Sequence, residues 1–369
     1  MRRIGRYRQR REKQKKILII GSLSLLLFLC AGYAAFSTNL SITAKGNIKE
    51  KSRVIQSWDD ISQTDFHSDF YKEHVVSATF LDNNNVPDNA TESWNVSEDK
   101  ENGGVMAWVV PNNNDNTKYD LYIGAKGGVI ANPNSGYLFY LCIGIEVIDF
   151  NNNYDTRYVT NMVSMFAGTW SEDGSMSMSL KEIKGLENFD TSNVTYMTGM
   201  FLYCTDLTSL NVSSFNTSNV TDMSYMFNRL ESLKTIDLSN FDTSKVTNME
   251  RMFRDSGFVN LDLSNFNTSR VINMDAMFYG NTNLESLDLS GFDTSNVISM
   301  WAMFAFNSKL KYLNLCSFST YKVENMVYMF AETYSLEHIY VGSNWNTSNA
   351  DTSGMFSNSN IRSVTTGQC

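Results

Sequence analysis

Short runs of alternating apolar and polar residues recur through the C-terminal part of the chain. In the string LDLSNF at residues 261–266, leucine alternates with polar residues, and this period of two predicts a short strand with one buried face. The segment that follows each FDTSNV-like string has a helical spacing, because its apolar residues fall at positions i, i+3, i+6 and i+7. A hydroxyl of Ser218 or Thr221 is the expected N-cap of one such helix. The apolar stripe of that helix is Val220, Met223, Met226 and Phe227.

The strand and the short helix form a unit that repeats about every 26 residues. A Met-x-x-Met-Phe string follows each complete copy of FDTSNV or its variants, and these strings account for most of the 19 methionines. Because one unit cannot bury its apolar side alone, we predict an α/β repeat solenoid with one short strand and one short helix per repeat. Methionine is expected to fill its core, since its flexible side chain suits irregular gaps. The eight copies begin at Tyr154, Phe189, Phe215, Phe241, Phe266, Phe292, Phe318 and Trp345.

The N-terminus joins a basic segment to an apolar one. Residues 2–16 contain nine Lys or Arg and one Glu, and residues 17–36 have no charged side chain and are long enough to cross a bilayer as a helix. A basic flank before the apolar stretch favours the N-in, C-out orientation. Two interpretations stay open: a retained transmembrane signal anchor, or a secretory signal peptide cleaved near the small residues Gly32, Ala34 and Ala35. Both place the rest of the chain outside the cytoplasm.

The body that follows is acidic. The chain has 30 basic and 39 acidic residues and a net charge of −9, so the residues after the basic segment carry 21 basic and 38 acidic side chains. An acidic body repels a phosphate backbone, and we therefore expect no nucleic-acid partner.

The cysteines do not indicate a disulfide-rich scaffold. After the apolar segment there are only four in a long chain, although an extracellular compartment permits disulfides. Cys204 and Cys316 occupy different positions in their repeats, which argues against a bond between them. The other two are Cys142 and Cys369.

The consensus LxxLDLSxFDTSxVxxMxxMF resembles the repeat of bacterial BspA-like leucine-rich-repeat surface proteins over about residues 145–363. The strings SATFLDNNNVPDNATESWNVS and KYDLYIGAKGGVIAN also resemble the segment that precedes the repeats in such proteins. The resemblance implies a solenoid of the leucine-rich-repeat type in a secreted or surface-attached protein. It also implies adhesion, because family members are linked to binding of host extracellular-matrix proteins and of other cells.

These features divide the chain into six expected parts. Residues 73–146 contain runs of β-forming residues separated by Asn-, Gly- and Pro-rich turns, which predicts a β-rich cap for the open end of the solenoid. A separate ligand-binding module is the alternative for this segment. The parts are a basic cytoplasmic tail (1–16), a transmembrane signal anchor or signal peptide (17–36), a polar spacer (37–72), the β-rich N-terminal cap (73–146), the repeat solenoid (147–363) and a tail (364–369).

No pattern of catalytic residues stands out. His67, His74 and His338 are far apart in sequence and lie in no metalloprotease or nucleophile motif, so we expect neither an enzyme nor a cofactor. One constellation remains: the middle residue of each Leu-x-Leu string should face outward, and stacking would align three aspartates whose charges repel. Hydrogen bonds to local turns are the first explanation, and a Ca²⁺ site or a ligand surface are the alternatives. This ladder is Asn211, Asp237, Asp262, Asp288, Asn314 and Tyr340.

Tyrosines concentrate in the C-terminal copies, and Tyr312 and Tyr340 are the ones we expect to contact a ligand, together with the ladder. We expect a non-catalytic protein, secreted or held at the cell surface by its N-terminal helix, that binds an extracellular protein or glycan. The alternative is a structural protein of surface or biofilm assembly without a discrete ligand.

Overall fold

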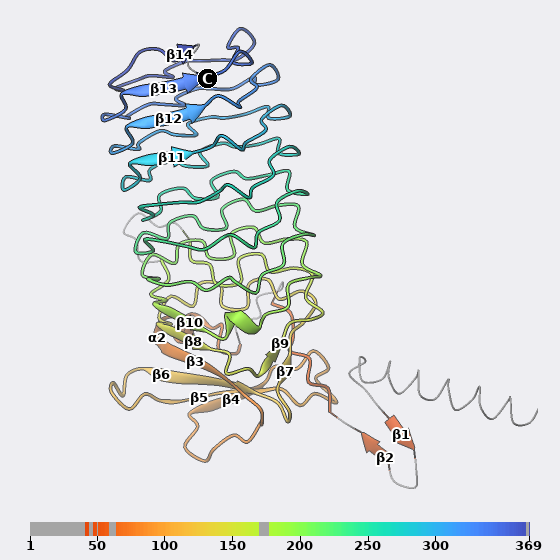
Figure 1. Cartoon of the computed structure of the whole chain (residues 1–369). Coiled ribbons are helices and arrows are strands. Elements are labelled where there is room, and N and C mark those ends of the chain that lie inside the picture. The colour runs from red at the N-terminus through yellow and green to blue at the C-terminus, as the bar shows by residue number, and fades with distance from the viewer. Residues whose placement is uncertain (1–40, 44–46, 50, 59–63, 170–176, 367–368) are drawn as a thin grey trace, which may run out of the picture.

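The protein forms a stack of backbone coils that rises from a mixed sheet, with the C-terminus at the far end of the stack (Figure 1). The structure, a computed structural model, describes residues 41–43, 47–49, 51–58, 64–169, 177–366 and 369. The predicted basic tail and membrane segment, residues 1–16 and 17–36, lie outside the described residues. Within the described part, no helix is both long enough and apolar enough to cross a membrane.

The described elements are short. Two of them are helices: the α-helix α2 (Asp69–His74) and the 3-10 helix η1 (Leu186–Asn188). The strands are β1 (Ser41–Thr43), β2 (Asn47–Lys49), β3 (Val75–Leu81), β4 (Glu92–Asn95), β5 (Met106–Pro111), β6 (Tyr119–Gly124), β7 (Val129–Ile130), β8 (Val147–Asp149), β9 (Tyr154–Asp155), β10 (Glu182–Lys184), β11 (Ser286–Asp288), β12 (Tyr312–Leu315), β13 (His338–Val341) and β14 (Thr365–Thr366).

The segment before the repeats forms one sheet with the first of them. The strand order is β10-β8-β3-β6-β5-β4, in which the pairs from β10 to β6 are parallel and the last two pairs are antiparallel. Strands β3, β5 and β6 have buried residues along one face or both, as their β-branched and aromatic residues predict. Because β8 and β10 belong to the repeat region, the stack is an extension of this sheet.

Each coil is joined to the next by a parallel bridge at the same position of the repeat. In the coil that contains Asp222, the N–H groups of alternate residues 223–229 donate to the carbonyl oxygens of alternate residues 248–254 over distances of 2.8–3.1 Å. The same bonds join residues 135–141 to residues 161–167, so the coil conformation begins before the first copy of the sequence repeat. The bridge residues are Asn134, Asn161, Tyr196, Asp222, Asn248, Asn273, Ser299, Asn325 and Asp351.

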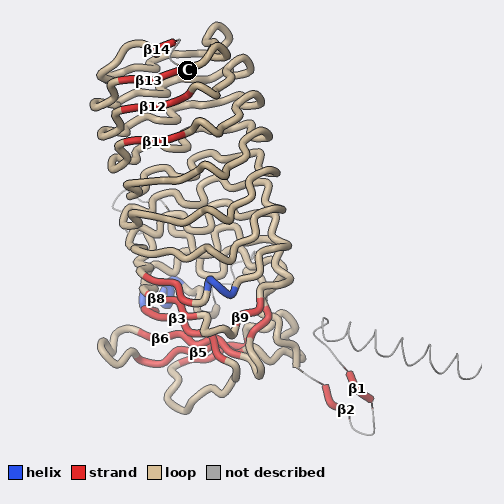
Figure 2. Tube along the Cα trace, viewed as in Figure 1, coloured by secondary structure: helices blue, strands red, loops and turns tan. Residues whose placement is uncertain are grey.

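The predicted fold class, an α/β leucine-rich-repeat solenoid with a helix in each repeat, is wrong. The Met-x-x-Met-Phe segments contain no helix in the described chain, and most of the stack is drawn as loop in Figure 2. An α-helix needs φ near −63° at every residue and bonds from N–H(i) to C=O(i−4). Here the residue before the second methionine is left-handed, for example Tyr225 with φ of 60°, and alternate N–H groups bond to the next coil instead. The stripe Val220, Met223, Met226 and Phe227 is nevertheless fully buried.

The strands predicted at the Leu-x-Leu strings are only partly present. Strands β11, β12, β13 and β14 form a parallel sheet at the C-terminal end, whereas the strings around Asn211, Asp237 and Asp262 carry no assigned strand. Their side chains still alternate: Leu261 and Leu263 are buried and Asp262 between them is exposed.

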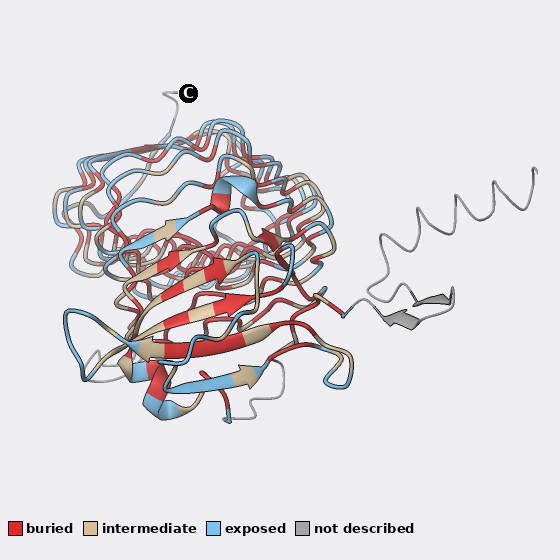
Figure 3. Cartoon of the chain, turned by 90° about the horizontal axis from the view of Figure 1, so that it is seen from below, coloured by how far each residue is buried: buried red, intermediate tan, exposed pale blue. Residues whose placement is uncertain are grey.

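Two ladders of side chains hold the coils together. Phenylalanine rings of the Met-x-x-Met-Phe segments, together with Phe139 before them, stack from coil to coil with centroids 5.5–6.2 Å apart. In every repeat but the last, a buried threonine bonds to the backbone of the next coil: Thr217 Oγ1 donates to Asp242 O (2.9 Å) and accepts from Asp242 N (2.8 Å). Seen along the stack, the coils lie over one another with exposed residues on their outer rim (Figure 3). The stacked rings are Phe139, Phe166, Phe201, Phe227, Phe253, Phe278, Phe304, Phe330 and Phe356.

Candidate functional site

The aspartate ladder is built from turns. The carboxylates of Asp237, Asp262 and Asp288 each accept a hydrogen bond from the backbone N–H of the serine two residues later, at 3.0, 3.0 and 2.9 Å. Asn211 and Asn314 do the same at 3.1 Å, so an amide oxygen serves in this position as well as a carboxylate. These are Asx turns, in which the side chain mimics a backbone carbonyl.

The turns also stabilise the negative charge. Hydrogen bonds from the side chain and the backbone N–H of the following serine hold the pKa of Asp237 below its usual value. Hydrogen bonds from the backbone and side chain of Ser264 lower the pKa of Asp262, and those from Ser290 lower the pKa of Asp288. Repulsion by the neighbouring aspartate raises both pKa values, but by less. Local turns therefore account for the carboxylates. Among the described residues, no three His, Cys, Asp or Glu side chains gather as a metal site would require.

The two tyrosines expected to contact a ligand lie on the C-terminal sheet, where each stacks with His338. Strand β12 pairs with β13 so that Tyr312 faces His338 and Asn314 faces Tyr340. The His338 ring stacks with Tyr312 (centroids 5.9 Å apart) and with Tyr340 (5.7 Å). Tyr312 is 45% exposed, and its hydroxyl donates to Glu337 Oε2 at 2.8 Å, a bond that raises the pKa of Tyr312. We call Tyr312, His338 and Tyr340 the aromatic triplet.

An arginine and aromatic cavity lies at another corner of the coils, and the sequence did not reveal it. Arg254 Nε is 3.0 Å and Arg229 Nε is 3.7 Å from Asp255 Oδ2, while the Arg254 guanidinium lies 4.3 Å from the centre of the Tyr279 ring. Tyr279 also contacts Phe306, with centroids 5.0 Å apart, and the cavity has a volume of about 380 Å³. These residues occupy variable positions of separate repeats, so only the stacking brings them together.

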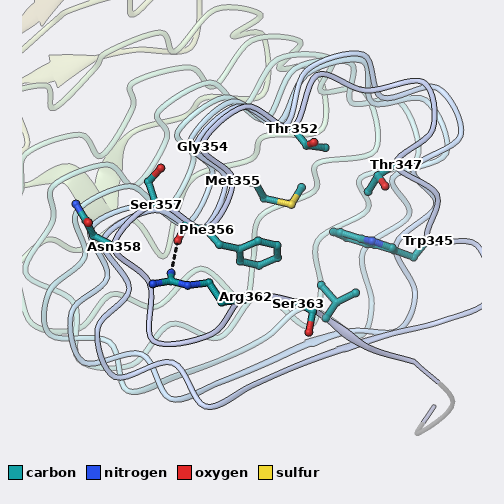
Figure 4. Close-up of a pocket in the computed structure, with 11 residues that line it drawn as sticks. Trp345, Thr347, Thr352, Gly354, Met355, Phe356, Ser357, Asn358, Arg362 and Ser363 are labelled. Atoms are coloured by element: carbon teal, nitrogen blue, oxygen red, sulfur yellow. Dashed lines mark hydrogen bonds between the residues drawn. The ribbon is translucent and has the colours of Figure 1, made fainter.

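A larger pocket of about 650 Å³ lies at the C-terminal end of the stack. Figure 4 shows Phe356 at its centre, with Met355 and Trp345 on one side and Arg362 on the other. Arg362 Nη1 donates to the carbonyl oxygen of Phe356 at 2.8 Å. The degraded last repeat is the only sequence signal for this pocket.

The C-terminal tail is fastened to the stack by a disulfide between Cys316 and Cys369. The sequence did not predict this bond. Cys316 does not pair with Cys204, as predicted, because its partner is Cys369; Cys204 and Cys142 are free and buried. Burial raises the pKa of the Cys142 thiol to about 12, so this thiol is unreactive at neutral pH.

One buried acid–histidine pair has a structural role. His67 Nδ1 lies 3.0 Å from Asp65 Oδ1, and His67 Nε2 donates to Leu138 O at 2.8 Å. Burial raises the pKa of Asp65, but the hydrogen bond and charge of His67 outweigh it and the net pKa is lowered. Since both ring nitrogens are engaged, the pair holds the segment around residue 66 against the first coil.

The geometry defines a repeat protein of stacked coils, with a cavity of about 380 Å³ on its outer surface and a pocket of about 650 Å³ at its C-terminal end. The chain belongs to the family described as "Mycoplasma protein of unknown function, DUF285", whose model matches residues 172–286 and 258–366, together more than half of the chain. Neither a curated protein nor a solved structure matches the chain.

Proposed function

We propose that the protein is a bacterial cell-surface or secreted protein that binds an extracellular protein or glycan without catalysing a reaction. The family match, the resemblance of the repeat to BspA-like proteins and the apolar segment 17–36 support this proposal. The elongated stack supports it physically, since its length offers an extended surface for recognition.

The observation that carries the proposal is the aromatic triplet. Exposed positions of the stack are mostly Ser, Thr, Asn and Asp, which contribute little to binding energy, whereas tyrosine is enriched among residues that dominate interfaces. Tyr312, His338 and Tyr340 form a ring-lined surface on a sheet whose strands fix their positions. Such rings can stack on the apolar faces of sugars or on side chains of a protein partner.

Screening the full-length chain against arrays of matrix proteins and glycans tests the proposal. For any saturable hit, replacing Tyr312→Ala and Tyr340→Ala together should weaken the affinity at least tenfold, because each tyrosine is expected to contribute more than about 1 kcal/mol. Tyr321→Ala is the matched control, since Tyr321 is 53% exposed and lies outside the triplet. An equal affinity of the double variant would reject the triplet as the site. Binding that never saturates, with self-association, would favour a surface-assembly protein instead.

A further inference from the structure

The last coil leaves a row of backbone donors without a partner. In the preceding coil, four alternate N–H groups donate to four carbonyl oxygens of the last coil over 2.8–3.1 Å. These donors are Met326, Tyr328, Phe330 and Glu332, and their acceptors are Asp351, Ser353, Met355 and Ser357. The equivalent N–H groups of the last coil, one repeat further along the chain, donate to no acceptor within the described residues. They are the N–H groups of Thr352, Gly354, Phe356 and Asn358.

The carbonyl oxygens beside these donors are already bonded. Thr352 O accepts from Met355 N (3.0 Å) and Gly354 O accepts from Ser357 N (2.9 Å). Phe356 O accepts from Ser359 N (3.1 Å) and from the Arg362 guanidinium. The edge therefore presents free N–H donors at alternate residues, whereas the carbonyl oxygens of Thr352, Gly354 and Phe356 are already bonded. A binding partner must supply a row of carbonyl oxygens.

The other side of the stack ends in a strand, which is tied down by the disulfide. Strand β14 pairs with β13 there, and the Cys316–Cys369 disulfide ties the tail to the stack. The open edge borders the pocket of about 650 Å³, whose floor contains Trp345, Met355 and Phe356 (Figure 4). Met355 is almost buried, whereas Phe356 and Trp345 are half-buried, so apolar surface remains beside the donors.

A second folded copy does not fit this edge. Two copies meeting through their C-terminal ends would place donors against donors. The N-terminal end of the stack is covered, because the Phe66 ring packs on Phe139 (centroids 6.4 Å apart) and His67 donates to Leu138 O. The occupant must therefore be a chain segment with free carbonyl groups, as in strand addition to a sheet edge.

The backbone of the last coil restricts the segment further. Gly354 and Asn358 are left-handed, with φ of 64° and 53°, and the same two positions are left-handed in the six repeats before them. A segment that follows this path turns left-handed at the same two positions. Gly adopts this conformation at the lowest steric cost, so Gly before the second methionine favours binding, although Tyr, Arg, Ser and Ala also occupy that position in the coils.

We propose that the open C-terminal edge binds an unfolded segment of another polypeptide that contains a Met-x-Gly-Met-Phe sequence. The segment lies parallel to the last coil as one further coil. Its alternate carbonyl oxygens accept from Thr352, Gly354, Phe356 and Asn358, and an apolar side chain enters the pocket. This binding is independent of the aromatic triplet and of the ligand proposed for it.

The probe is a synthetic peptide with the sequence SNVTYMTGMFLY of residues 192–203, and the protein is the full-length chain. In the free protein, the four open amides should exchange hydrogen at least 100-fold faster than those of the preceding coil, because only the latter are hydrogen-bonded. The peptide should slow the exchange of all four. A peptide with Val at the position of Gly199 is the matched control and should bind at least tenfold more weakly.

Filling the pocket separates edge binding from unspecific adhesion. Ser363→Trp places a ring in the pocket and should weaken peptide binding at least tenfold, whereas Ser295→Trp, an exposed serine several coils away, should not change it. No binding at millimolar peptide, equal binding of the control peptide, or equal binding by the Ser363→Trp variant would each overturn the proposal.

Discussion

At the scale of single residues, a left-handed position in the Met-x-x-Met-Phe segment of each repeat shapes the path of the backbone. It precedes the second methionine, and a non-glycine residue there costs about 1–2 kcal/mol. Bonds to the neighbouring coil offset this cost, because each left-handed turn directs alternate N–H groups out of the coil. The occupants are Ser164, Gly199, Tyr225, Arg251, Ala276, Ala302, Tyr328 and Gly354.

Substitution of Gly199 tests this account. A Cβ at this position would meet Leu202 and Ser164 atoms at 3.5 Å, which is ordinary contact, so only the φ of 59° opposes a side chain. We expect Gly199→Val to lower the free energy of unfolding by about 1–2 kcal/mol, measured by urea denaturation. Gly199→Asn should cost clearly less, since Asn tolerates this conformation. Equal losses for the two variants would contradict a conformational cause.

At the scale of the coil, the turns are closed by side chains that replace regular secondary structure. The Asx turns at the Leu-x-Leu strings use Asp or Asn, and buried threonines such as Thr217 join one coil to the next. The Met-x-x-Met-Phe stripe was correctly predicted to be buried, but its spacing is shared by a helix and by a turned coil. The hydrogen bonds that distinguish the two run to residues about 26 positions away, which periodicity within one segment does not show.

Acid should weaken the coils through these turns. The pKa values of Asp237, Asp262 and Asp288 are lower in the folded chain than in the unfolded one, so their contribution to stability is present above about pH 4. It is lost as the pH falls through the lowered folded values. The melting temperature should therefore drop between about pH 4 and pH 2.

A triple variant with Asn at the three aspartates identifies the source of this acid effect. Its melting temperature at pH 7 should stay close to the wild-type value, because Asn keeps the acceptor oxygen, as Asn211 and Asn314 do. Its drop on acidification should be smaller. The triple Ala variant should be less stable at both pH values, and an unchanged acid drop in the Asn variant would reject the assignment.

At the scale of the whole molecule, the two ends of the stack are closed differently. The sheet before the repeats covers the first coil, with Phe66 and His67 packed against it. At the other end, β14 is the last strand of its sheet, the disulfide ties the tail to the stack, and the donor row of the last coil is open. The arginine and aromatic cavity and the aromatic triplet also exist only at this scale, since each combines residues from different coils.

Loss of the disulfide should open the C-terminal end. We expect Cys369→Ser to lower the free energy of unfolding by about 2–4 kcal/mol, because the bond closes a long loop of the unfolded chain. Reduction of the wild-type protein should reproduce this loss in urea denaturation and should leave the variant unchanged. A variant as stable as the oxidised wild type would show that the tail does not need the bond.

The sequence by itself determined which residues are buried, where each repeat begins and which side chains face outward. Burial depends on apolar spacing, and spacing is a local property of the chain. Tertiary structure alone decided that the repeat is a turned coil and not a helix, that Cys316 bonds to Cys369, and that Tyr312 meets Tyr340 across His338. These features rest on contacts between coils, such as the Tyr312–His338 stacking and the disulfide, which join residues a full repeat or more apart in sequence.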